Sequence, residues 1–284
     1  MTLRNPRNAS GGNGLFYWLV QHWLRLVILG LVLYVGLPFA APVLMHVGAE
    51  GPARLIYTLY SPLCHQLGFR SWFLFGAQTA YPLRAAGVGG VGAFEDYALQ
   101  DPVYAAEFAT YRDAAAQTEG VKDPERAAFL QTGRAFIGNA QMGYKVALCE
   151  RDVAIYAALL AGALLFARLR DRLRPVPIWL YLLLGIAPIG LDGFSQLLSD
   201  PQLGLWPLRE STPLFRALTG ALFGLMNAWL AFPYIEITMR EARRDMEARQ
   251  AQAADVAAAR ARSRERLEAW AGEAGPRHDA EAEE

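Results

Sequence analysis

The chain has 284 residues, of which 54% are hydrophobic, 12% aromatic and 19% charged, and its formal net charge at pH 7 is zero. This composition exceeds the apolar content that a soluble domain needs for its core and favours an integral membrane protein. A zero net charge provides no basic field for nucleic acid, and the sequence has neither a glycine-rich phosphate loop nor an aromatic RNA-reading motif. We therefore expect no nucleic-acid partner.

The first apolar run covers residues 26–45 and contains no charge. At about 1.5 Å per residue it is long enough to cross the roughly 30 Å hydrocarbon core, so it predicts a transmembrane helix. Arg4 and Arg7 precede it, which leaves a cleavable signal peptide as an alternative, although Pro42 after the small-residue site argues against cleavage. Residues 1–25 are then expected to be a cytoplasmic N-terminal segment.

A long excursion, residues 47–144, separates the first apolar run from the second. Its middle, residues 94–134, mixes both charges with alanine and predicts about two exposed helices that are broken near Gly120 and Pro124. Its beginning, residues 57–75, is aromatic and apolar, which is typical of an interfacial or re-entrant segment.

The second apolar run, residues 153–167, is too short to cross a bilayer by itself. We expect its helix to begin near Tyr144, so that the span covers about residues 146–167. Cys149 and Asp152 would then share one helix face in the outer part of the bilayer. A thinner bilayer, or a helix that begins at the headgroups, remains an alternative.

Two further spans are predicted at residues 176–196 and 217–235. The third contains Asp192 as its only charge, and an ionised aspartate at membrane depth is expected to face the bundle interior or water. The fourth contains Gly220 and Gly224 at the spacing that lets two helices approach closely.

Basic residues indicate the orientation of these spans. They precede the first span, fill the loop between the second and third, and follow the fourth: Arg4, Arg7, Arg168, Arg170, Arg172, Arg174, Arg240, Arg243 and Arg244. The positive-inside rule predicts that both termini are cytoplasmic. The expected fold is thus an all-α polytopic protein with four transmembrane helices, N-in and C-in, in the cytoplasmic (inner) membrane.

The chain after the fourth span alternates Arg, Glu and Ala. Residues 236–271 predict a solvated cytoplasmic helix that binds a protein partner, and residues 272–284 are expected to be disordered.

Polar clusters occur at the predicted extracytoplasmic ends of the spans, where charged and thiol groups are costly, so together they predict a site. We assign acid-base roles to His65 and Asp192, because a carboxylate in reach would orient the imidazole. The expected ligand-binding residues are Gln66, Arg70, Arg151, Asp152, Gln196, Arg209 and Arg216. Pairing of these arginines with Glu150, Asp152, Asp192 and Glu210 is the alternative, in which their role is structural.

The chain contains two cysteines, Cys64 and Cys149, both on the predicted extracytoplasmic side. A disulfide between them is one interpretation. A metal site, with zinc as the candidate ion, is the second, since thiolate, imidazole and carboxylate groups are all at hand. Thiol redox chemistry is a third interpretation, against which the absence of a CxxC motif argues, and unpaired structural cysteines are the fourth.

Several strings in the chain resemble the prokaryotic membrane proteins catalogued as domain of unknown function 2085. They are Ser61-Pro62-Leu63-Cys64-His65-Gln66, Arg70-Ser71, Gly138-Asn139 with Lys145, Cys149-Glu150-Arg151-Asp152, Ile155-Tyr156, Asp192-Gly193-Phe194-Ser195-Gln196, and Arg216 to Gly224. The resemblance covers residues 57–234 and implies a polytopic membrane protein without an assigned activity. It implies nothing for the insertion at residues 87–134.

A weaker similarity joins Asp192, Gln196, a downstream arginine and the helix with Gly220 and Gly224 to VanZ-like glycopeptide-resistance membrane proteins. It points to the cell envelope. The expected function is binding or processing of an anionic lipid or envelope precursor in an outward-facing polar pocket. The alternative is a non-catalytic scaffold or accessory membrane subunit. A Cys64–Cys149 disulfide would stabilise it, and its C-terminal helix would recruit a partner.

Overall fold

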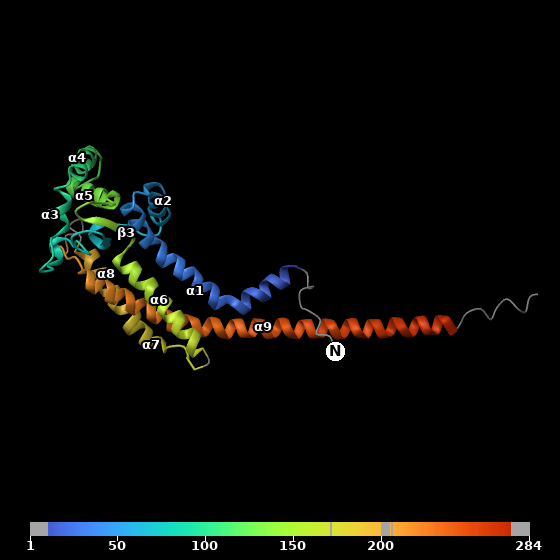
Figure 1. Cartoon of the computed structure of the whole chain (residues 1–284). Coiled ribbons are helices and arrows are strands. Elements are labelled where there is room, and N and C mark those ends of the chain that lie inside the picture. Colours follow the sequence, from blue (N-terminus) through green and yellow to red (C-terminus); the bar gives the residue numbers. More distant parts are fainter. Residues whose placement is uncertain (1–10, 171, 200–204, 206, 274–284) are drawn as a thin grey trace, which may run out of the picture. The chain divides into compact units, whose positions relative to one another are not determined.

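The computed structural model describes residues 11–170, 172–199, 205 and 207–273 (Figure 1). Four of its helices are long and apolar enough to cross a membrane, and they cover Gly14–His46, Glu150–Leu169, Ile178–Leu198 and Pro213–Trp270. The predicted all-α polytopic membrane fold is therefore confirmed.

The elements follow one another along the chain in this order: α1 (Gly11–His46), α2 (Glu50–Tyr60), the 3-10 turn η2 (Gly68–Arg70), β1 (Ser71–Leu74), the 3-10 turn η3 (Arg84–Ala86), α3 (Phe94–Ala98), α4 (Pro102–Ala116), α5 (Pro124–Ala135), β2 (Gly138–Asn139), β3 (Gly143–Cys149), α6 (Glu150–Leu169), α7 (Ile178–Leu180), the π-helix η4 (Tyr181–Ile186), α8 (Ala187–Leu198) and α9 (Pro213–Glu273). The chain divides into two compact units, one from residues 1–23 with 235–284 and one from residues 24–234.

The first unit consists of the start of α1 and the distal part of α9. The indole of Trp23 donates to Glu236 at 3.0 Å, and the Tyr17 hydroxyl donates to Glu247 at 3.1 Å. Residues 247–270 are exposed throughout, as expected for a solvated helix.

Three predicted boundaries in this unit differ from the structure or lie outside it. Helix α1 begins at Gly11, so most of the segment predicted as residues 1–25 is the start of the first helix. The charged helix predicted at 236–271 is continuous with the fourth span, since α9 runs from Pro213 to Glu273 and passes through Pro233 without ending there. Of the predicted disordered tail, Gly272 and Glu273 end α9, and residues 274–284 lie outside the described residues.

In the second unit, α6 and α9 pack closely through small residues. A Cβ atom added to Gly224 would lie 2.2 Å from the carbonyl oxygen of Ile155, and one added to Gly220 would lie 2.7 Å from that of Arg151. The Gly220–Gly224 pair therefore acts as the predicted packing motif, since only glycine lets the two backbones approach this closely.

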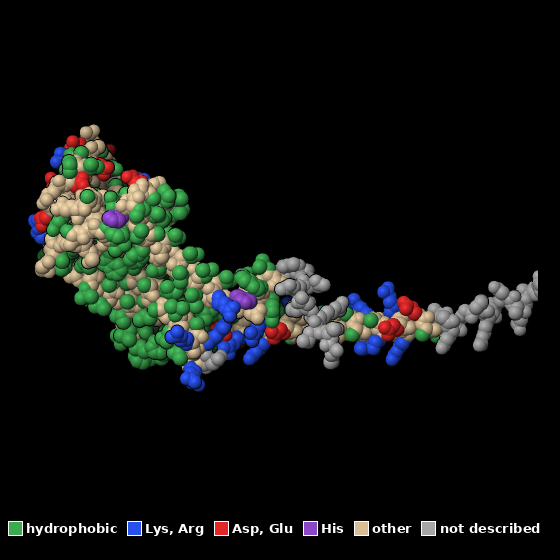
Figure 2. All heavy atoms as spheres, viewed as in Figure 1, with side chains coloured by type: hydrophobic (Ala, Val, Ile, Leu, Met, Phe, Trp, Pro, Cys, Tyr) green, Lys and Arg blue, Asp and Glu red, His purple; other side chains and the backbone are tan. Residues whose placement is uncertain are grey.

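The third span is one helix of three parts, α7, η4 and α8. Its π-helical turns precede Pro188, which has no N–H to donate and whose ring crowds the preceding turn. The outer surfaces of the spans are strongly apolar, and Figure 2 shows them as an extensive hydrophobic surface that differs from the charged surface over α4 and α5.

The excursion forms a compact body on the end of the bundle. The predicted break near Gly120 and Pro124 is found, since α4 ends at Ala116 and α5 begins at Pro124, but α3 adds a third, short helix. Its core contains buried aromatic rings from η2, β1, α3 and α4, from the loop between β1 and η3, and from the residue that follows α5: Phe69, Phe73, Phe94, Tyr104, Tyr81 and Phe136.

A three-stranded antiparallel sheet of order β1-β3-β2 was not expected from the sequence. Residues 143–149 form the central strand, so the expected start of the second span near Tyr144 is wrong and α6 begins at Glu150. The strand is favoured because it pairs with both β1 and β2 and buries most of its side chains. Within the sheet, Ser71 lies opposite Cys149, which fixes the segment after Cys64 beside the start of α6.

Candidate functional site

The polar clusters that the sequence singles out meet at one end of the helices of the second unit. The start of α6 supplies Arg151, the middle and the last turn of α8 supply Asp192 and Gln196, and the segment before α9 supplies Arg209. These groups come from elements far apart in the sequence, so the helix ends form a single polar network.

Asp192 is the centre of this network, and its side chain is fully buried. Arg151 donates to its Oδ2 atom, while Arg209 donates to Oδ1 at 3.0 Å. Ser211 Oγ also donates to Oδ1, and Gln196 Nε2 donates to Oδ2 at 3.0 Å. A buried carboxylate held by two guanidinium groups and two neutral donors is well satisfied, which is what a charge at this depth requires.

Glu210 is the second anionic centre. Arg70 binds it in a bidentate arrangement, with both N···O distances at 2.9 Å, and Arg216 pairs with its Oε1 atom. Arg216 also donates to Gln196 Oε1 at 3.1 Å, so the two centres are linked. The alternative that these arginines pair with acidic residues is thus found for Arg70, Arg151, Arg209 and Arg216.

Some residues of the network were missed as site residues. Glu210 and Ser211 lie within the Arg209 to Arg216 cluster, where a polar stretch beside a predicted span was the available signal. Glu150 is buried, and its Oε2 atom has no hydrogen-bond partner among the described residues. Arg126 comes from the insertion, and no local pattern connects it with the spans.

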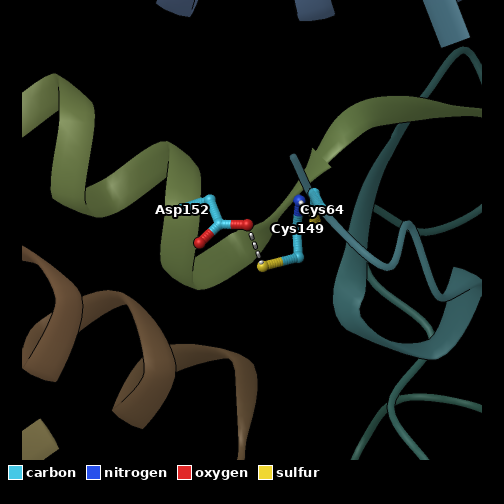
Figure 3. A group of neighbouring side chains, drawn as sticks. All are labelled: Cys64, Cys149 and Asp152. Atoms are coloured by element: carbon cyan, nitrogen blue, oxygen red, sulfur yellow. Dashed lines mark hydrogen bonds between the residues drawn. The ribbon is translucent and has the colours of Figure 1, made fainter. Parts of the chain in front are cut away.

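Cys64, Cys149 and Asp152 form a second cluster beside the first (Figure 3). Both cysteines are free thiols, and the two sulfur atoms and a carboxylate oxygen all lie within 4.8 Å of one another. The Cys149 thiol donates to Asp152 Oδ2 at 3.1 Å. Contact with Cys149 lowers the pKa of Cys64, whereas contact with Cys64 and burial raise the pKa of Cys149, so Cys64 ionises more readily. The disulfide stays a prediction.

The turn that carries Cys64 is held tightly. Gln66 has a φ of 52°, a left-handed conformation that is uncommon for a residue with a side chain. Its side-chain amide donates to Tyr57 O at 2.9 Å, and the buried Lys145 ammonium donates to the carbonyl oxygens of Gln66 and Arg134 at 2.6 and 2.7 Å. Burial lowers the pKa of Lys145 to about 7. Gln66 therefore fixes the turn from the inside.

Two pockets open next to these clusters. The first, which we call the thiol pocket, has a volume of about 240 Å³, and the second, the arginine pocket, has a volume of about 280 Å³. They share Arg70, Arg151 and Gln196. The thiol pocket is also lined by Cys64, His65, Gln66, Cys149, Asp152 and Arg216, and the arginine pocket by Arg126, Arg209 and Glu210.

The structure does not bring His65 and Asp192 together as an acid-base pair. His65 is exposed at the thiol pocket, while the oxygens of Asp192 are occupied by Arg151, Arg209 and neutral donors. Among the described residues no hydrogen bond joins the two. The structure therefore gives His65 no orienting carboxylate from Asp192, and Asp192 serves as an anchor for arginines.

Comparison with known proteins agrees with the membrane fold. Residues 133–230, about a third of the chain, match the family model described as "Predicted membrane protein (DUF2085)". The resemblance read from the sequence is thereby confirmed for this segment, which runs from the end of α5 into the first third of α9 and contains Cys149 and Asp192. The Cys64-His65-Gln66 string lies outside it. No curated protein and no solved structure matches the chain.

Proposed function

We propose that this multi-pass membrane protein binds an anionic headgroup, a phosphate or carboxylate, in its arginine pocket. The observation that carries the proposal is the charge of the lining. Among the described residues, four guanidinium groups and one carboxylate face this pocket: Arg70, Arg126, Arg151, Arg209 and Glu210. Among these lining residues guanidinium groups outnumber carboxylates, also when the buried Asp192 is counted, and their exposed donors attract an anion.

The arginines are also held in position before an anion arrives. Glu210 holds one edge of the Arg70 guanidinium group, and Asp192 holds those of Arg151 and Arg209. The side chains of Arg70, Arg151 and Arg209 keep 33%, 21% and 41% of their surface exposed. A planar guanidinium with a free edge binds phosphate or carboxylate in a bidentate manner, at a small cost in entropy when it is already oriented. Arg216, only 5% exposed, has the supporting role of holding Glu210.

The place of the pocket favours a lipid or lipid-linked ligand. It lies where α6 begins and α8 ends, which are the ends of two spans, and headgroups occur at that depth. We further propose that the protein resides in the inner membrane with both termini cytoplasmic, as the positive-inside rule predicts, so that the pocket faces outward. A bound envelope precursor would then present its charged group to the arginines.

Thermal stability in detergent tests the proposal. We expect a short-chain phosphatidic acid to raise the midpoint of unfolding of the wild type, because a ligand that binds the native state stabilises it. The Arg209→Gln variant should need at least about tenfold more of this lipid for the same shift, since one charge-assisted hydrogen bond is lost. Arg112→Gln is the matched control, because Arg112 pairs with Asp113 on α4 outside the pocket.

Each outcome has a defined meaning. A shift with inorganic phosphate as large as that with the lipid would identify free phosphate as the ligand. A short-chain phosphatidylcholine with an equal effect, or an unchanged response of Arg209→Gln, would disprove anion binding in this pocket.

A non-catalytic scaffold is the second candidate, and the exposure of every residue from 247 to 270 favours it. A helix that is exposed on all sides buries no apolar face to stabilise it, and a cytoplasmic partner that covers its exposed hydrophobic side chains, such as Leu267 and Trp270, would do so. Under this alternative, deletion of residues 243–284 abolishes cellular function and leaves insertion intact. If recruitment is not the function, the deleted protein retains full activity in a complementation assay, with membrane fractionation to check its amount.

A further inference from the structure

The thiol cluster offers a metal-binding site in addition to the arginine pocket. We propose that Cys64, Cys149 and Asp152 bind a zinc ion whose fourth coordination position opens into the thiol pocket. Two sulfurs and one carboxylate oxygen form a donor set that suits zinc better than a hard cation such as magnesium or calcium. Three protein ligands with an open fourth position are typical of zinc sites that also bind water or substrate.

The distances fit such a site with little movement. The donor atoms lie within 4.8 Å of one another, and Cys149 Sγ is already 3.1 Å from Asp152 Oδ2. Ligands at about 2.0 to 2.3 Å from a tetrahedral zinc are roughly 3.5 Å apart, so rotation of side chains closes the remainder. Cys149 is the N-cap of α6 and Asp152 lies three residues later, which places both donors on one helix end.

The backbone around Cys64 holds its sulfur in place. Sγ accepts hydrogen bonds from the backbone N–H of Gln66 at 3.5 Å and from that of Cys149 at 3.3 Å. The first of these comes from the residue in the left-handed conformation, which Lys145 keeps in place through the Gln66 carbonyl. N–H groups aimed at a sulfur orient and stabilise a metal-bound thiolate.

Charge balance also favours the ion. Two thiolates and a carboxylate carry three negative charges, and zinc supplies only two positive ones. Lys145 lies close enough to Cys64, and Arg70 close enough to Cys149, for electrostatic interaction. Arg70 as a cation, and Lys145 when it is protonated, favour the single negative charge that the site retains after zinc binds, which is the outer-shell support that such sites require.

The fourth position faces the thiol pocket, which Arg70 and Arg151 also line. Because the same two arginines line the arginine pocket, an anion held there would lie next to the metal. The zinc site stands on its own donors, however, and its test does not require that an anion bind.

The test measures metal on the purified, detergent-solubilised full chain. We expect one zinc per chain after purification with zinc present, and its loss in Cys64→Ser, Cys149→Ser and Asp152→Ala. Asp113→Ala, an exposed carboxylate on α4, is the matched control and should retain the metal. Replacement by cobalt should give a thiolate-to-cobalt charge-transfer band in the near ultraviolet.

A variant that exchanges one metal ligand for another keeps the test decisive if the other variants fold poorly. Asp152→Cys should retain the metal and strengthen the cobalt charge-transfer band by about half, because three thiolates replace two. The intact mass, measured with and without reductant, distinguishes the zinc site from a disulfide between the two cysteines. A two-proton mass deficit that reductant reverses, without bound metal, would establish the Cys64–Cys149 disulfide and overturn the zinc site, as would free thiols that bind no zinc.

Discussion

Replacement of Asp192 by asparagine should destabilise the protein by about 3 kcal/mol. Asn keeps the shape of the side chain, but it replaces one acceptor oxygen with an NH2 donor that would face other donors. It also leaves Arg151 and Arg209 without their shared counter-ion. Removal of one partner from a buried ion pair typically costs about 3 to 5 kcal/mol, and we expect the lower end because Arg209 is 41% exposed and partly solvated. Chemical unfolding of the detergent-solubilised variant measures the change.

A second substitution makes this prediction specific to charge. Asp192→Asn combined with Arg209→Gln removes one of the two guanidinium groups left without a counter-ion, so the double variant should recover part of the lost stability. Glu50→Gln is the control, because Glu50 forms an ion pair with Arg54 in which both side chains are 61% exposed, and such pairs contribute little. Stability losses that simply add in the double variant would contradict the role of Asp192 as anchor of the arginines.

Replacement of Gly224 by alanine should destabilise the bundle by about 3 kcal/mol. The new methyl group would lie 2.2 Å from the carbonyl oxygen of Ile155, and backbone atoms cannot move aside as a flexible side chain can. Helices α6 and α9 would have to separate. Because α6 carries Arg151 and α9 carries Arg216, the same substitution should also weaken anion binding.

Gly190→Ala in α8 is the matched control, since no atom lies within 4 Å of a methyl group added there. Alanine favours a helix over glycine, so this variant should be as stable as the wild type or slightly more so. Equal stability of Gly224→Ala and Gly190→Ala would show that α6 and α9 do not pack through the glycine pair.

The membrane fold was predictable because it depends on local composition. Uncharged runs of sufficient length identify the spans, and the spacing of Gly220 and Gly224 identifies a packing face without knowledge of its partner. The sheet was not predictable in this way. Residues 143–149 form a short apolar segment that could equally begin a helix. They form a strand because they pair with β1, which lies about seventy residues earlier in the sequence, and no local pattern shows that pairing.

The sequence predicted most of the residues of the candidate site, but it did not predict which of them pair with one another. The rule that polar groups at membrane depth are rarely accidental selected Asp192, Arg151 and the cysteines. It did not indicate that Asp192 would be saturated by arginines, nor that His65 would remain on the pocket surface. Arg126 was missed because only the folding of the insertion onto the bundle brings α5 to the pocket, and no periodic pattern encodes that contact.

Native mass spectrometry of the protein released gently from membranes tests the central claim most directly. The wild type should carry a lipid whose phosphate or carboxylate headgroup has a net negative charge, Arg209→Gln should lose it, and Arg112→Gln should keep it. If wild type and Arg209→Gln carry the same lipids in the same amounts, the arginine pocket does not bind an anionic headgroup.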